Sequence, residues 1–413
     1  MRPLRILSVL GQRPGFTGSG ILVQELWKCA VVHGDLQRLI CAGYADDDWC
    51  REFGHEYSVV TCSQAGCRGN LPFPVPGMSD VMPYPSVRYC DLSSGQVKCF
   101  ISQFRRVVTQ VIREFRPDLL HIHHLWALTD LWRVAKRLPC FVTVHGTDLK
   151  LAKSAGKHRH LAARNINEMA HYFCVSKDMA ADAANEYGIE SKKMSILGNG
   201  YNPEIFKDRG SGTNVAGKIV LCAGKFVGWK GFRFAIRASA EARTPHQLVI
   251  LGTGAKEERA NLLRHAEECG VKVLFPGHVS HQEVARWMRR ADVFVLPSIH
   301  EPFGMVLLEA MACGCRVVAS ASGGPKDIIS RQLLDLGFAH LIPPLMENVV
   351  GDKERYVRDL AKAILLQLKA GQSEKVRVSI ATSVAGMTWA SVYKRMRSKY
   401  CELITQTPGN HSS

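Results

Sequence analysis

Short, almost purely apolar runs recur along the chain, and stretches with helical spacing separate them. The runs are rich in Val, Ile, Leu and Phe and contain few polar residues. Strands that are buried on both faces of a parallel sheet have this continuous apolar character. We therefore expect strands at 6–10, 36–42, 57–62, 119–123, 141–144, 172–175, 194–197, 219–223, 248–251, 271–275, 293–296, 317–319 and 340–342.

The stretches between these runs have the periodicity of helices. In the segment 20–32, for example, Leu22, Leu26 and Ala30 recur at every fourth position. Strands that alternate with helices predict βαβ units and an α/β fold with doubly wound parallel sheets. The predicted strands are too many for one such sheet, so we expect two Rossmann-like domains. The polar, glycine-containing segment 207–218 is the expected linker between them.

Two segments interrupt this alternation. Residues 62–99 contain five prolines and little periodicity, which predicts a loop much longer than usual. Its aromatic residues Phe73, Tyr84 and Tyr89 suggest a packed functional loop, and we list them as candidate acceptor-binding residues. Near the C-terminus, an apolar stripe predicts a helix that packs on another element, and 405–413 should be a disordered tail. The stripe consists of Trp389, Val392, Tyr393, Met396 and Tyr400.

The chain is basic, with 53 Lys and Arg against 37 Asp and Glu in 413 residues and a formal charge of +16. These cations are spread along the chain without a nucleic-acid-binding motif, so we expect no nucleic-acid partner. The densest basic run is either a solvated helix face or a contact with anionic lipid or a phosphorylated acceptor. It contains Lys150, Lys153, Lys157, His158, Arg159, His160 and Arg164.

The expected location rests on three features that the sequence lacks: a membrane-spanning run, a signal peptide and a C-x-x-C pair. No apolar run approaches the 18 to 20 residues, roughly, that span a bilayer, and the N-terminus lacks the features of a signal peptide. The 14 cysteines include no C-x-x-C pair and fit a reducing compartment. We expect a cytoplasmic protein, with peripheral contact at the inner membrane face left open by the basic run.

The segment 293–314 carries the most informative polar residues. A predicted strand is followed by a loop with Glu301 and then by an apolar helix that includes Glu309. A buried carboxylate needs a partner, so Glu309 should hold sugar or ribose hydroxyls, or alternatively a buried arginine. Glu301 lies at the carboxyl end of a strand, where open α/β sheets bind ligands. The main-chain amides at the start of the helix should favour an anionic or hydroxyl ligand there; they belong to Phe303, Gly304 and Met305.

This Glu-x₇-Glu spacing, with Pro-Phe-Gly after Glu301 and Ala-Met-Ala-Cys-Gly after Glu309, resembles the signature of the retaining glycosyltransferases of family 4. The resemblance extends over residues 5 to about 400. It implies the GT-B fold, in which two Rossmann-like doubly wound parallel-sheet domains face each other across a cleft. It further implies an N-terminal acceptor-side domain at 1–205, a nucleotide-sugar donor domain at 206–386, and a helix at 387–404 that returns to the first domain.

Other segments match the family's pattern in order. The turn after the strand at 219–223 is similar to one whose two cations, here Lys225 and Lys230, grip the donor diphosphate. The family usually has arginine at the first position, and lysine keeps the charge but loses the bidentate fork. His145 resembles the strand-end histidine near the transferred sugar. In the N-terminal loop, which departs from the family's tandem glycine, counting back from Leu26 places Gly18 on the glycine whose amide approaches the diphosphate, and Gly20 is the alternative.

The resemblance assigns roles to these residues and implies no cofactor. Lys225 and Lys230 would neutralise the leaving nucleoside diphosphate and replace a metal ion. Glu309 would hold the ribose hydroxyls, Glu301 a sugar hydroxyl, and His145 would reach the sugar from the other domain. We therefore list Glu301, His145 and Lys230 as the candidate catalytic residues.

A second histidine group needs its own interpretation. His121, His123 and His124 could suggest a metal site, but the strand directs neighbouring side chains to opposite faces. We expect packing in the core or the cleft for them, and no metal.

The function that we expect is transfer of a hexose from a nucleotide sugar, UDP-linked rather than GDP-linked, to a glycan, a lipid-linked sugar or a small molecule in polysaccharide or glycoconjugate synthesis. The segment 323–327 resembles the Gly-Gly-Pro-x-Asp of the sucrose-phosphate synthase branch, without naming an acceptor. Two alternatives remain: a nucleotide-sugar epimerase with the GT-B fold, and a non-catalytic nucleotide-sugar-binding module.

Overall fold

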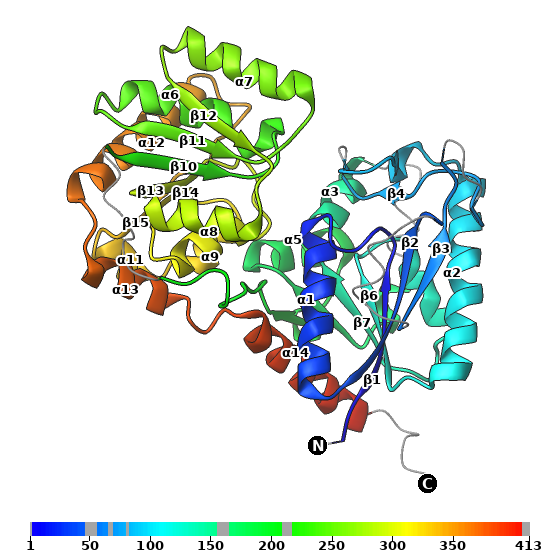
Figure 1. Ribbon diagram of the computed structural model, residues 1–413. Helices are drawn as coiled ribbons and strands as arrows, with labels where there is room; N and C mark the ends of the chain where they lie inside the picture. Colours follow the sequence, from blue (N-terminus) through cyan, green and yellow to red (C-terminus); the bar gives the residue numbers. More distant parts are fainter. Residues whose placement is uncertain are drawn as a thin grey trace. The chain divides into compact units, whose positions relative to one another are not determined.

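A computed structural model describes residues 2–45, 56–64, 69–79, 82–154, 165–208 and 217–406 of the chain (Figure 1). The chain divides into two compact units. Unit 1 comprises Met1–Gly198 with Trp389–Ser413, and unit 2 comprises Asn199–Thr388. Each unit contains one large parallel sheet with helices on both faces, so the predicted pair of Rossmann-like domains is confirmed.

Unit 1 has a seven-stranded sheet in the order β3-β2-β1-β6-β7-β8-β9, and all neighbouring strands pair in parallel. The order reverses between β1 and β6, because the chain first builds outward to β3 and then crosses to the other side. The strands are β1 Arg5–Leu10, β2 Leu36–Gly43, β3 Tyr57–Thr61, β6 Leu119–His123, β7 Cys140–Val144, β8 His171–Cys174 and β9 Met194–Ile196.

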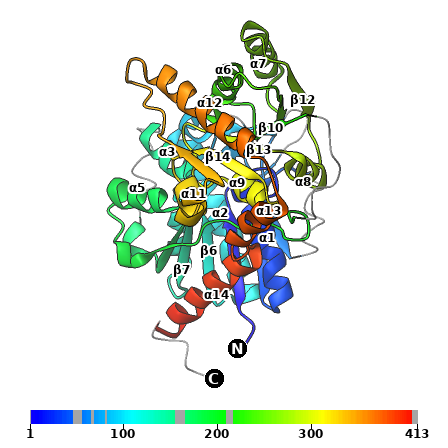
Figure 2. The same ribbon diagram turned by 90° about the vertical axis from the view of Figure 1, so that its left-hand side faces the viewer.

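Helices cover both faces of this sheet. Helix α2 lies on one side, and α1 and α14 lie side by side on the other (Figure 1, Figure 2). The α-helices are α1 Gly18–His33, α2 Ser94–Phe115, α3 Thr147–Ser154, α5 Lys177–Tyr187 and α14 Trp389–Gln406. The 3₁₀ helices are η2 Tyr89–Asp91, η3 Ala127–Arg133, η5 Ile166–Glu168 and η6 Ser191–Lys193, and two short strands, β4 Pro76–Gly77 and β5 Val87–Arg88, pair with each other.

Unit 2 has a six-stranded parallel sheet in the order β12-β11-β10-β13-β14-β15, with its reversal between β10 and β13. The strands are β10 Ile219–Ala223, β11 Gln247–Leu251, β12 Val273–Gly277, β13 Val293–Leu296, β14 Arg316–Ser320 and β15 Ala339–Ile342. Helices α6 and α12 pack together over one face, and α8 and α9 pack together near β13 and β14. The helices are η7 Gly228–Lys230, α6 Phe232–Glu241, α7 Lys256–Glu268, α8 His281–Arg290, α9 Met305–Ala312, α10 Pro325–Ile328, α11 Arg331–Asp335, α12 Asp352–Ala370 and α13 Glu374–Ser383.

Every predicted strand overlaps one strand of these two sheets. The segment 62–99 differs from its prediction, because α2 already begins at Ser94. A capping box explains this start: Gln96 N donates to the Ser93 hydroxyl, and Ser93 N donates to the Gln96 side chain. Unit 2 begins at Asn199 rather than at 206, since Tyr201 N donates to Met387 O within it. The middle of the expected linker, 209–216, and the tail 407–413 lie outside the described residues.

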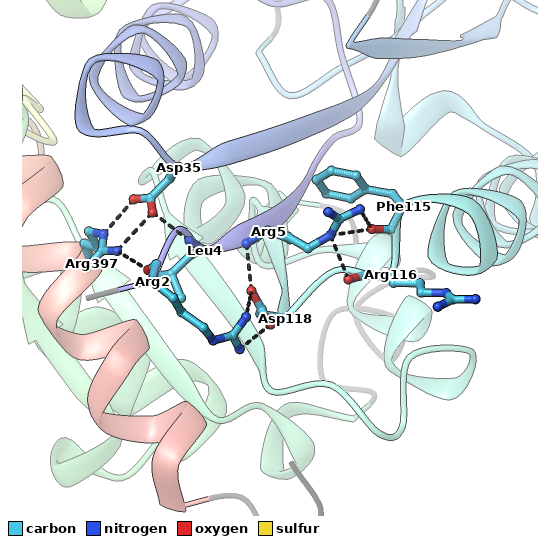
Figure 3. A network of polar contacts seen from close by, with 8 residues as sticks. All are labelled: Arg2, Leu4, Arg5, Asp35, Phe115, Arg116, Asp118 and Arg397. Carbon is cyan, nitrogen blue, oxygen red and sulfur yellow. Dashed lines mark hydrogen bonds and ion pairs between the residues drawn. The ribbon is translucent and has the colours of Figure 1, made fainter. Parts of the chain in front are cut away.

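The predicted C-terminal helix is present as α14, and its apolar stripe is buried. A polar network ties this helix to the first strands of unit 1 (Figure 3). Arg397 donates to both oxygens of Asp35, at 2.6 and 3.0 Å, and Leu4 N donates to the same carboxylate at 2.7 Å. The Tyr393 hydroxyl adds a contact of 2.6 Å. Both apolar and charged contacts therefore make α14 part of unit 1.

Most of the basic run predicted at 150–164 cannot be placed. Lys157, His158, Arg159, His160 and Arg164 lie outside the described residues, and only the backbone is described at Lys153. In the parts of the chain that are described, we find no helix with the length and apolarity needed to cross a bilayer.

Candidate functional site

The loops beside the strand-order reversal of unit 2 carry three of the predicted donor-binding and catalytic residues. Lys225 and Lys230 follow β10, and Glu301 follows β13. Ligands of open α/β sheets bind at the carboxyl ends of strands next to such a reversal. Because β10 and β13 are neighbours, both cations and the carboxylate lie at one edge of the sheet.

Lys230 and Glu301 form an ion pair at this edge. The Lys230 ammonium lies 2.6 Å from Oε2 of Glu301, and the Ser298 hydroxyl donates to the same oxygen at 2.8 Å. The two charged side chains are only 12% and 7% exposed. The ammonium also lies 4.7 Å from the centre of the Trp229 ring. The sequence predicted both charged residues, but it indicated neither their pairing nor the contribution of Ser298.

Glycines allow the loops around this pair to pack closely. Gly231, with φ +72°, lies so near Pro297 that an added Cβ would be 1.9 Å from the Pro297 carbonyl oxygen. A Cβ on Gly323 or Gly324 would lie 2.0 Å from the carbonyl oxygen of Glu301 or Phe303. Only glycine fits such close approaches. The Gly-Gly-Pro segment was noticed in the sequence as a branch resemblance, and the structure shows that it supports the Glu301 loop.

The two lysines of the β10 loop influence each other. Burial lowers the pKa of Lys225, and the positive charge of Lys230 lowers it further. Both effects disfavour the charged ammonium. An anion bound beside Lys225 would have the opposite effect, so this loop is better suited to an anionic ligand than to a neutral one.

Glu309 lies on α9 and keeps part of its surface exposed, although protein atoms surround the carboxyl group closely. Burial raises its pKa to about 8. No ion pair within the described ranges includes Glu309, so the structure gives no support to the alternative of a buried arginine partner. The carboxyl group is therefore buried without a charged partner among the described residues.

The helix start next to Glu301 matches its prediction. Helix α9 begins at Met305, directly after Gly304, which has φ +96°. Phe303 is buried beneath this turn. The first amides of a helix have no acceptor within the helix itself, so the segment 303–305 presents main-chain donors at the same edge as Glu301.

In unit 1, the predicted His145 directly follows β7. Its ring lies 4.5 Å from that of His124 and 5.7 Å from that of His123, measured between centroids. Burial lowers the pKa of His145, and the neighbouring His124 and His121 lower it further. The ring is therefore neutral at neutral pH, and its Nε2 is buried without a hydrogen-bond partner among the described residues.

The other histidines of this group are packed in the core, as predicted. The Tyr400 hydroxyl lies 2.6 Å from Nδ1 of His121, and the Thr143 hydroxyl lies 2.7 Å from its Nε2. His123 and His124 are 2% and 3% exposed. Over the described residues, no group of three or more His, Cys, Asp or Glu side chains is arranged to hold a metal ion.

Gly18 is the first residue of α1, and Thr17 caps this helix by accepting from Gly20 N. Gly18 is exposed, whereas an added Cβ on Gly20 would lie 2.7 Å from Gly15 N. Of the two glycines, Gly20 is therefore required for packing. The assignment of Gly18 to the donor phosphate stays a prediction.

The structure gives the three aromatic residues of the proline-rich segment a different role from the predicted one. Phe73, Tyr84 and Tyr89 are 4%, 7% and 2% exposed and belong to the apolar core of unit 1. Tyr89 packs edge-on against Phe100 and Trp126, with 5.8 Å between ring centroids in each case. Rings enclosed in this way cannot present a face to an acceptor, so we withdraw the three residues as acceptor contacts.

Comparison with known proteins shows the family of the chain. The family model described as Glycosyltransferase Family 4 matches residues 49–205, and the one described as Glycosyl transferases group 1 matches 204–333. The D-inositol 3-phosphate glycosyltransferase of Pseudarthrobacter chlorophenolicus is 30% identical over 308 residues, which cover 66% of this chain and 71% of that protein. The chain belongs to glycosyltransferase family 4.

Solved structures agree with this family at the level of the fold. Sucrose-phosphate synthase of Thermosynechococcus elongatus has a TM-score of 0.70 at 18% identity, with 98% of this chain and 100% of that chain covered. HepE of Anabaena in complex with UDP has a TM-score of 0.71 at 16% identity, with 97% and 100% covered. The fold is GT-B.

The chain also matches two uncharacterized glycosyltransferases of Methanocaldococcus jannaschii, and the matched part spans 60% and 62% of their lengths.

Proposed function

We propose that the chain is a retaining hexosyltransferase that moves a hexose from a nucleotide sugar to a glycan, a lipid-linked sugar or a small-molecule acceptor. The observation that carries this proposal is the Lys230–Glu301 ion pair at the strand-order reversal of unit 2. Uridine diphosphate is the nucleotide that we favour, because HepE of Anabaena was solved in complex with UDP and with UDP-glucose.

The two lysines of the β10 loop would supply the main electrostatic contribution. When the bond between the anomeric carbon and the phosphate oxygen breaks, negative charge grows on the nucleoside diphosphate. Preorganised cations stabilise such charge without reorganisation during the reaction. Glu301 holds the Lys230 ammonium at 2.6 Å. With Lys225 in the same loop, the pair would perform the task that a divalent metal performs in other transferases.

The carboxyl groups would hold the two sugar rings of the donor. We assign the ribose hydroxyls to Glu309 and a hydroxyl of the transferred hexose to Glu301. The amides of 303–305, together with Gly18, would bind phosphate oxygens, and His145 would contact the hexose through Nε2, which lacks a hydrogen-bond partner among the described residues. In the transfer, the acceptor oxygen bonds to the anomeric carbon on the face that the phosphate leaves, and the acceptor's proton passes to the phosphate.

The relatives do not favour one class of acceptor, because they include glycogen synthases of Mycobacterium tuberculosis, 27% identical over 231 residues, as well as enzymes named for small molecules. Besides the D-inositol 3-phosphate glycosyltransferase, they include a mannosylfructose-phosphate synthase of Agrobacterium fabrum, 30% identical over 208 residues. The Gly323-Gly324-Pro325 segment packs on the Glu301 loop and fits the resemblance to the sucrose-phosphate synthase branch. Any contact with anionic membrane through the basic run at 150–164 stays a separate hypothesis.

Replacement of Lys230 by methionine tests the proposal. Methionine keeps much of the volume and removes the charge, so we expect kcat for the hydrolysis of the accepted nucleotide sugar to fall about 10²- to 10³-fold. The matched control is Lys256→Met, because Lys256 is an exposed lysine of the same unit at the start of α7. Release of nucleotide at the wild-type rate by folded Lys230→Met would refute the assigned role.

A further inference from the structure

Asp148 is a buried carboxylate that binds main-chain amides. It lies in the first turn of α3 and has no exposed surface. Its Oδ1 accepts from Gly146 N at 2.7 Å, and its Oδ2 accepts from Leu125 N at 2.9 Å. His145 N lies 3.2 Å from both oxygens, and Leu149 N lies 3.3 Å from Oδ1. Hydrogen bonds to an ionised acceptor are stronger than those between neutral groups, so this carboxylate holds its surroundings firmly.

These amides come from two different loops. Leu125 belongs to the loop after β6, whereas His145 and Gly146 belong to the loop after β7. The two strands are neighbours in the sheet, and His124 N also donates to Thr143 O at 3.0 Å. Asp148 thus joins the two loops at the carboxyl edge of unit 1, immediately beyond the end of their strand pairing.

The joined loops carry two imidazole rings in contact. His124 has φ +78°, a left-handed conformation that non-glycine residues seldom adopt without support from their surroundings. From this position its ring lies 4.5 Å from the ring of His145. The amide of Leu125, directly after His124, is fixed by Asp148. One carboxylate therefore determines both where the backbone of His145 runs and where the ring beside it is placed.

We propose that Asp148 is a positioning residue for glycosyl transfer, which fixes the main chain of His145 and the adjoining His124 loop so that the His145 ring is aligned for the sugar. The inference rests on the function proposed above for His145. Asp148 takes no part in bond making, since its oxygens are occupied by main-chain donors. Its effect is geometric, and small misplacements of a positioned group can lower a rate by orders of magnitude.

The test is a double-mutant cycle of Asp148→Asn and His145→Ala, read as kcat and KM for donor hydrolysis. An asparagine amide nitrogen would face main-chain N–H groups and break part of the network, so we expect Asp148→Asn to lower kcat about 10- to 100-fold. KM should change much less. In the His145→Ala background, Asp148→Asn should have almost no further effect, because the ring that it positions is gone.

The control is Asp118→Asn. Asp118 is a buried carboxylate at the opposite end of β6 that also accepts a main-chain amide, from Arg5 N at 2.8 Å. It should affect stability but leave kcat nearly unchanged below the melting transition. If His145→Ala has wild-type kcat, the proposed role of His145 fails. If His145→Ala is impaired and Asp148→Asn lowers kcat by the same factor in both backgrounds, the positioning role is overturned.

Hydrogen exchange on the wild-type chain provides a second test that does not depend on the variants folding. The amides of Gly146 and Leu125 lie outside the strand ladders, yet each donates to Asp148. We expect both to exchange as slowly as the amides of β7. Exchange at the rate of an unprotected loop would overturn the proposal.

Discussion

Glu309 is a buried carboxyl group without a charged partner among the described residues. Burial raises the pKa of its carboxyl group to about 8, so the group is mostly protonated at neutral pH. A carboxylate accepts hydrogen bonds from hydroxyls better than a neutral carboxyl does. If Glu309 holds the ribose, binding of the donor should favour the ionised form and release a proton.

This coupling predicts a pH-dependent affinity. Below pH 8 each molecule of donor that binds must remove the proton from Glu309, so affinity should rise about 25-fold from pH 6.5 to 8.5 and then level off. Calorimetry in two buffers of different ionisation enthalpy would measure both the affinity and the proton released. Glu309→Gln is the control and should bind more weakly with no such slope. A flat wild-type profile would contradict the ribose role.

The individual charged residues of the site could be predicted from the sequence, but several of their contacts could not. Glu301 was predicted from its place after a strand with a clear apolar pattern, whereas Lys230 was predicted from the resemblance of its turn to that of the family. Their ion pair depends on β10 and β13 being neighbours, and the order of strands in a sheet cannot be inferred from either segment alone.

The prediction that Tyr84 and Tyr89 contact the acceptor failed for a similar reason. Aromatic residues in a proline-rich segment are common both in binding loops and in cores, and only tertiary packing distinguishes them.

At the scale of elements, the strands were well predicted because parallel strands buried on both faces have few polar residues. The start of α2 was not predicted, because the prolines before it indicated a loop and the capping box at Ser93 and Gln96 was not recognised.

The turns that connect strand to helix in unit 2 depend on glycine. Gly231 has φ +72° and lies against the Pro297 carbonyl group, so the β10 loop can approach the β13 loop only if this position has no side chain.

We therefore expect Gly231→Ala to destabilise unit 2 by about 3 kcal/mol, from left-handed backbone strain together with the clash against Pro297. It should also lower activity, because Lys230 directly precedes the strained residue. The measurement is thermal unfolding followed by circular dichroism. Gly228→Ala is the control in the same turn, since nothing lies within 4 Å of an added Cβ there. Equal stability of the two variants would contradict this account of the loop.

Helix α14 offers a second prediction at this scale. Burial by itself would raise the pKa of Asp35, but hydrogen bonds from Arg397, Leu4 and Tyr393 outweigh it and hold the pKa below its usual value. Arg397→Met would leave this buried carboxylate without its cation, which destabilises a protein by about 3 to 5 kcal/mol. The control on the same helix is Lys399→Met, whose pair with Glu402 is partly exposed and should contribute less than about 1 kcal/mol. Chemical denaturation would compare the two, and similar losses would show that the network in Figure 3 does not anchor α14.

At the scale of the whole molecule, the sequence indicated two α/β units because the strands were too many for one sheet. In the structure, each unit has its own strand-order reversal, and the loops beside the two reversals carry different kinds of side chains. Lys225, Lys230 and Glu301 lie at the reversal of unit 2, whereas the His124 and His145 loops lie at the carboxyl edge of unit 1. Under the proposed function, the loops of unit 2 would bind the nucleotide and His145 of unit 1 would contact the sugar.

The central claim is that this chain retains anomeric configuration while it takes a hexose from a nucleotide sugar through unit 2. One measurement tests it most directly: proton NMR of UDP-, GDP- and ADP-linked α-hexoses incubated without acceptor, with the wild-type chain and with Glu301→Gln. We predict slow conversion of one donor to nucleoside diphosphate and the α-anomer of the free sugar, with the conversion lost in the variant. First appearance of the β-anomer would contradict retention. A panel in which no donor is consumed, and none shows saturation transfer from the protein, would contradict the donor site itself.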